Sequence, residues 1–138
     1  MTTEERAVAA GCLDVVADTV LLLTSHGQET RGFVTLYSGL RSWLTRHGSM
    51  HELRALRDEA SGMRRVLEEA SSSKASGDPR LDAAVRSNLA WTVWRVASFM
   101  CGQHDASVAV WCRMSLAQAR ARYEGVNPMF TEGDAEGG

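Results

Sequence analysis

The chain has 138 residues, a formal net charge of −2, 44% hydrophobic residues and 23% charged residues. These values favour one domain with a substantial core and exclude an intrinsically disordered chain. No uninterrupted apolar run approaches the roughly 20 residues that cross a bilayer, and Glu4 and Glu5 do not suit the basic start of a secretory signal. We therefore expect a cytoplasmic protein without a membrane segment. Fourteen arginines against the single Lys74 indicate the coding bias of a GC-rich, bacterial genome.

Helix start and stop signals divide the chain into five segments. Capping pairs begin the first and third segments, Asp78-Pro79 begins the fourth, and glycines follow the ends of four segments. Period-2 alternation is missing, so no strand is expected. The expected helices run from Thr2 to about Ser25, Thr30 to about His47, Ser49 to about Ser71, Asp78 to about Cys101, and Asp105 to about Gly125.

This pattern predicts an all-α fold, a compact five-helix bundle over residues 1–125 with a flexible connector at 71–78. A disordered acidic tail is expected over 126–138. The second and third helices carry apolar stripes in steps of three and four and are joined at Gly48-Ser49, so they should form an antiparallel hairpin. The stripes are Phe33, Leu36, Leu40, Trp43 and His47 on one helix, and Leu53, Leu56, Ala60, Met63, Leu67 and Ala70 on the other.

The fourth expected helix is apolar on two opposite sides, and one side carries Trp91 and Trp94. Two indoles present more apolar surface than a monomer usually leaves exposed. One interpretation is a central helix with neighbours on both sides. The other is an interface with a second copy, another protein or a hydrophobic ligand.

The second interpretation leads to our functional prediction. We expect a non-enzymatic interaction or assembly module, homo-oligomeric or a subunit of a larger complex. Because tryptophan and arginine dominate interface energetics, the expected contact residues are Trp91, Trp94 and Arg95, with Arg113 and Arg120 as an electrostatic rim.

An alternative function follows from the charge of residues 80–123, which hold six arginines against two acids, before an acidic tail. A basic helix pair of this kind could bind the backbone of a nucleic acid.

A third function rests on a short motif. Arg46-His47-Gly48-Ser49-Met50-His51 resembles the motif of HEPN-type ribonucleases, which are also small all-α domains and often dimeric. The resemblance covers six residues. It implies that Arg46 would hold the scissile phosphate while His51 moves protons.

The histidines and cysteines allow one conceivable zinc set, consisting of His47, His51, Cys101 and His104. No metal-binding spacing supports it, so neither a metal nor another cofactor is expected. The three cysteines are interpreted as small core residues, and a bridge between Cys101 and Cys112 would be too long.

Overall fold

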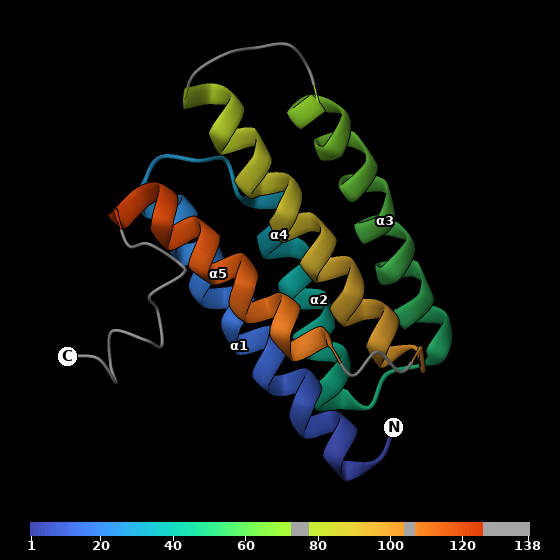
Figure 1. The fold of residues 1–138 in the computed structure, drawn as a ribbon. Helices are drawn as coiled ribbons and strands as arrows, with labels where there is room; N and C mark the ends of the chain where they lie inside the picture. The colour runs from blue at the N-terminus through green and yellow to red at the C-terminus, as the bar shows by residue number, and fades with distance from the viewer. Residues whose placement is uncertain (73–77, 104–106, 126–138) are drawn as a thin grey trace, which may run out of the picture.

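The structure is a computed structural model that describes residues 1–72, 78–103 and 107–125. Its helices are α1 (Thr3–Ser25), α2 (Arg31–Arg46), α3 (Met50–Ser72), α4 (Asp78–Met100) and α5 (Val108–Glu124), and the described residues contain no strand. Successive helices run in opposite directions, with α5, α4 and α3 in one layer and α1 and α2 behind it (Figure 1). The all-α bundle is therefore confirmed. Most of the expected connector and all of the expected tail lie outside the described residues.

The first helix begins where the capping pair predicts. The Glu5 amide donates to Thr2 Oγ1 over 3.1 Å, and the Thr2 amide donates to Glu5 Oε1 over 2.7 Å. Gly27, just after the end of α1, has a φ of +80°, and Gly125 after α5 has a φ of +73°. Both glycines take the left-handed conformation that commonly ends a helix.

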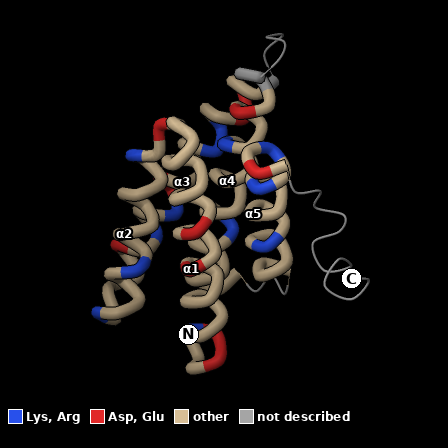
Figure 2. The backbone as a smooth tube through the Cα atoms, turned by 90° about the vertical axis from the view of Figure 1, so that its left-hand side faces the viewer, with Lys and Arg blue, Asp and Glu red and all other residues tan. Residues whose placement is uncertain are grey.

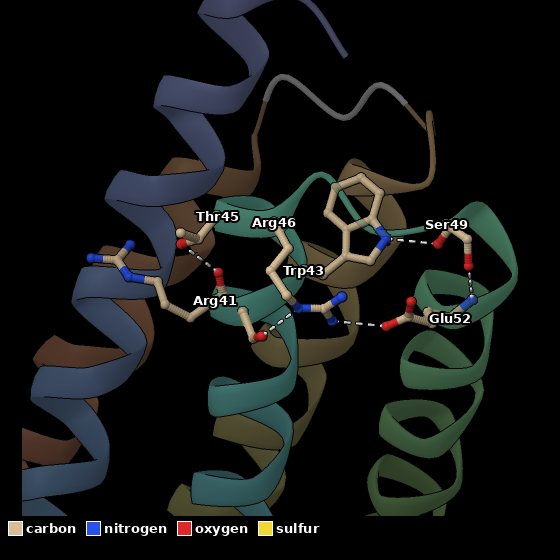
Figure 3. A network of polar contacts seen from close by, with 7 residues as sticks. Arg41, Trp43, Thr45, Arg46, Ser49 and Glu52 are labelled. Carbon is tan, nitrogen blue, oxygen red and sulfur yellow. Dashed lines mark hydrogen bonds and ion pairs between the residues drawn. The ribbon is translucent and has the colours of Figure 1, made fainter.

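The α2–α3 turn differs from the expectation in one respect. Helix α2 ends at Arg46, and His47 is an exposed left-handed residue with a φ of +56°, not a member of the buried stripe. Gly48 does not supply the left-handed residue at this helix end. It is required for packing, because a Cβ there would overlap the Trp43 ring. The indole of Trp43 donates from Nε1 to the Ser49 carbonyl oxygen over 2.7 Å (Figure 3). The indole thus holds the turn closed.

Two glycines set the register of the α2–α3 hairpin. Gly32 and Gly39 are seven residues apart on α2, and Met63 and Leu56 are seven apart on α3. A Cβ on Gly39 would lie 2.7 Å from Leu56 Cδ2, and one on Gly32 would lie 2.7 Å from Met63 Cε. Each larger side chain therefore fills the space that a glycine leaves open. The antiparallel hairpin is confirmed.

The apolar stripe of α3 is buried near the turn and opens toward the far end of the helix. Leu53 and Ala60 are fully buried, whereas Leu67 is half-buried and Ala70 is exposed. A pocket of about 250 Å³ lies where the two helices separate. It is lined by Glu29, Gly32, Phe33, Gly62, Met63, Val66, Leu67 and Arg86.

Helix α4 is the central helix, as the first interpretation of its two apolar sides predicts. It packs against each of the other four helices, and most extensively against α3. Its buried residues come from both sides of the helix. They are Val85, Ser87, Leu89, Ala90, Thr92, Val93, Val96, Ala97, Ser98, Phe99 and Met100.

Helix α1 contributes one side to the core and contacts α2, α4 and α5. Its buried residues include Leu13, Val16 and Leu23, while Asp14 is exposed and pairs with Arg41 over 2.8 Å. The whole helix is long and apolar enough to cross a membrane by length and composition alone. The expectation of no membrane segment considered only uninterrupted apolar runs. Charged residues interrupt the apolar residues of α1, so this helix did not count as such a run.

Leu23 and Leu21 provide a matched test of this packing. Leu23 is 0% exposed and Leu21 is 67% exposed on the same helix. Leu23→Ala should lower the free energy of unfolding by about 2–5 kcal/mol, because it leaves a cavity in the core. Leu21→Ala should change it by less than about 0.5 kcal/mol. Urea denaturation monitored by circular dichroism measures both, and equal effects would contradict the described packing of α1.

Candidate interaction surface

Two indoles on α4 meet an arginine from α3. Trp91 and Trp94 make an edge-to-face pair, with ring centroids 5.6 Å apart and an interplanar angle of 89°. The guanidinium carbon of Arg64 lies 4.2 Å from the Trp91 ring centroid and 4.8 Å from that of Trp94. These distances are typical of cation–π contacts. Arg64 therefore covers part of both rings from within the chain.

A second arginine extends this contact to α5. The guanidinium carbon of Arg95 lies 4.2 Å from the Trp111 ring centroid and 5.9 Å from that of Trp91. Three helices thus supply one group of alternating indoles and guanidinium groups. We call it the tryptophan–arginine cluster, consisting of Arg64, Trp91, Trp94, Arg95 and Trp111.

The cluster carries positive charge in a partly desolvated position. The Arg64 side chain is only 18% exposed, and its nearest acid is Glu68, 4.0 Å away. Its Nη2 donates to Ser61 Oγ over 3.5 Å, which is a long hydrogen bond. Arg64 Nε is buried and has no hydrogen-bond partner among the described residues. The indole faces are therefore the principal neighbours of this cation.

The structure brings together three of the five predicted contact residues. Trp91, Trp94 and Arg95 are half-buried neighbours on α4. The prediction did not include Arg64 or Trp111. The position of Arg64 could have been noticed, because it lies four residues after the buried Ala60 and therefore on the same side of α3. The indoles have an intrachain cover that sequence reasoning did not anticipate.

Arg113 and Arg120 lie away from the indoles. Arg113 lines a pocket that also includes Val8 and Cys12 of α1, so it lies on the α1 side of α5. Trp111 is two residues earlier and thus about 200° away around the helix. Arg120 is exposed and lies seven residues after Arg113, on the same side of the helix. The expected rim around Trp91 and Trp94 is therefore absent, and the two arginines border a different strip of α5.

That strip is an apolar seam on the outer side of α5. Val110 and Met114 are 45% and 47% exposed, and Ala117 and Ala121 are half-buried. The four residues follow one another in steps of four, three and four, which is the spacing of a coiled-coil seam. We call this strip the α5 seam. Trp111 borders one edge and Arg113 borders the other.

Several cations of the basic segment 80–123 are engaged within the chain. Arg122 Nε donates to Asp82 Oδ1 over 3.1 Å, and the Tyr123 hydroxyl donates to the same oxygen over 2.8 Å. Burial and the adjacent Asp82 carboxylate raise the pKa of Tyr123. Arg86 donates to the Glu29 carbonyl oxygen over 2.5 Å. Basic and acidic positions are interspersed along the helices in Figure 2.

The HEPN-like motif spans the α2–α3 turn. Arg46 ends α2 and its Nη2 lies 2.9 Å from Glu52 Oε2 (Figure 3). His51 lies on α3. The hydrogen bond and charge of Arg46 lower the pKa of Glu52. The Glu52 amide also donates to Ser49 Oγ over 3.2 Å, which is the expected cap at the start of α3. Arg46 is thus occupied in joining the two helices.

The conceivable zinc set cannot be assembled from the described residues. His104 lies outside them, and no group of three or more histidine, cysteine, aspartate or glutamate side chains within them could hold a metal ion.

Comparison with models of protein families, with curated proteins and with solved structures finds no match to this chain.

A double-mutant cycle tests the central contact of the cluster. Arg64→Ala and Trp91→Leu, made singly and together, should show a coupling of about 0.5–2 kcal/mol in the free energy of unfolding, because the guanidinium lies over the indole. The exposed neighbour Arg65 provides the control, and Arg65→Ala with Trp91→Leu should show almost no coupling. Chemical denaturation measures both cycles. Equal couplings would show that Arg64 makes no specific contact with Trp91.

Proposed function

We propose that this chain is a non-enzymatic helical interaction module that self-associates. The tryptophan–arginine cluster and the α5 seam form the contact surface. The observation that carries the proposal is the exposed apolar seam of α5 beside half-buried indoles, because a contiguous apolar patch on a small bundle commonly marks an interface.

The cluster has the composition of an interface centre. Tryptophan and arginine are the residue types most enriched at binding hot spots, and they act best when they are held rigid before contact. Arg64 and Arg95 already fix the indoles through stacking. Little side-chain freedom would therefore be lost when a partner covers them.

A second copy of the chain is the partner that the α5 seam favours. A seam spaced by three and four residues packs against another helix with the same spacing, and a symmetric dimer presents the same surface on both sides. Ala117 and Ala121 are small and would let the two backbones approach closely. Arg113 and Arg120 occupy one flank of the seam, where coiled coils usually place charged residues.

Self-association can be tested with a variant that leaves the core intact. Met114 is 47% exposed, so Met114→Glu should fold normally but place a charge in the seam. Sedimentation velocity should show a dimer of the unmodified chain and a weakening of at least about 30-fold for the variant. Leu21→Glu is the control, because Leu21 is exposed on α1 away from the seam, and it should leave the dimer unchanged.

Trp94→Ala tests the cluster separately. Removing this indole should weaken dimerisation by about 2 kcal/mol or more, the usual hot-spot value. Circular dichroism of the variant checks that it remains folded. A dimer that tolerates both Met114→Glu and Trp94→Ala, or a chain that stays monomeric at high concentration, would overturn the proposal.

The contacts favour self-association over binding to a nucleic-acid backbone. Arg86 and Arg122 have partners within the chain, and Arg95 stacks on Trp111. A salt titration distinguishes the two functions, because phosphate binding weakens steeply as salt increases and an apolar interface responds little. We expect dimerisation to be nearly independent of salt. Retention of the chain on nucleic acid at low salt would instead support the alternative.

A further inference from the structure

Two cysteines face each other across the interface of α1 and α5. Cys12 is 3% exposed and Cys112 is 1% exposed, and both are free thiols. Both also line one pocket of about 280 Å³. The other residues of this pocket are Val8, Gly11, Val15, Ala109 and Arg113. The two sulfurs are therefore packed in the core but border a space that a small molecule can enter.

The environment makes the two thiols unequal. The neighbouring Cys112 side chain is the main reason that the pKa of Cys12 is lowered. The positive charge of Arg113 acts in the same direction. The proximity of Cys12, together with burial, raises the pKa of Cys112. A thiolate at Cys12 is thus favoured beside a protonated neighbour.

We propose that Cys12 and Cys112 form a redox-active pair that a small hydroperoxide converts to an α1–α5 disulfide. The Cys12 thiolate attacks the terminal oxygen of the hydroperoxide, the O–O bond breaks, and hydroxide or alkoxide leaves. This step oxidises the sulfur to a sulfenic acid and reduces the peroxide by two electrons. The Cys112 sulfur then attacks the Cys12 sulfur. Its proton leaves with the sulfenic hydroxyl group as water, and the S–S bond forms.

The arrangement fits this sequence of steps. A reactive cysteine requires a favoured thiolate and access to the oxidant, and a resolving thiol must lie beside it. Cys12 has Arg113 and Cys112 as neighbours, and the pocket gives access from solvent. The third cysteine provides an internal comparison. Cys101 is half-buried at the end of α4, and burial raises its pKa.

The expected product links the first and last helices of the bundle. Cys12 and Cys112 are about 100 residues apart, and a bridge across a loop of this length restricts the unfolded chain strongly. Both residues line the same pocket between α1 and α5, so the bridge would join helices that are already in contact. The oxidised protein should therefore keep its fold and melt at a higher temperature.

The test is titration of the full chain with hydrogen peroxide. One equivalent should remove two of the three thiols and two hydrogen atoms from the intact mass. Peptide mapping without reduction should recover a peptide that joins Cys12 to Cys112, and dithiothreitol should reverse the change. The melting temperature should rise by about 5–15 °C.

Single variants separate the two roles. Cys112→Ala should stop at a sulfenic acid on Cys12, which dimedone labels, whereas Cys12→Ala should lose the reaction. Cys101→Ala is the control and should react like the unmodified chain. The proposal is overturned if the unmodified chain keeps all three thiols, forms only intermolecular disulfides, or is first oxidised at Cys101.

Discussion

Helix α4 contacts each of the other four helices, so its apolar surface has to be covered from several directions at once. Hydrophobic burial of this kind is not directional, and it would allow several arrangements. The close approach of α3 side chains to glycines of α2 makes the arrangement specific. Gly32 and Gly39 admit Met63 and Leu56, which fixes how far α3 slides along α2, and α3 then lies along α4. The position of Arg64 over the α4 indoles follows from this register.

On the indole side of α4, Arg64 covers part of the Trp91 and Trp94 rings, and both residues remain half-buried. A guanidinium group can stack on the face of an aromatic ring while the N–H groups at its edge still form hydrogen bonds with water or polar atoms. An aliphatic cover in place of Arg64 would turn this region into ordinary core. Stacked arginines hold the indoles in place in the single chain while the rings stay half-buried. The same arrangement accounts for the half-buried state of Trp91 and Trp94, in contrast to Trp43, which is 5% exposed.

Sequence patterns predicted the number of helices, their direction in the hairpin and most of their ends. These features depend on local signals, such as the Thr2–Glu5 capping pair and the glycine at position 27. Local signals of this kind did not predict the side-chain contacts between helices that are distant in sequence. The spacing of Trp91 and Trp94 indicated an unusual surface, and the spacing from Ala60 put Arg64 on the core side of α3. Nothing local showed that the Arg64 side chain would reach the indoles or that Arg113 would face α1. Those outcomes depend on the rotation of each helix in the bundle, which packing determines.

The pairing of α1 with α5 also has a consequence for the order of folding. Their contacts join segments about 100 residues apart, and closing so long a loop is entropically costly and slow compared with forming neighbouring hairpins. During synthesis α2, α3 and α4 can associate as each leaves the ribosome, but α1 lacks one neighbour until α5 has been made. The apolar first helix is therefore the part of the nascent chain that waits longest for its final contact.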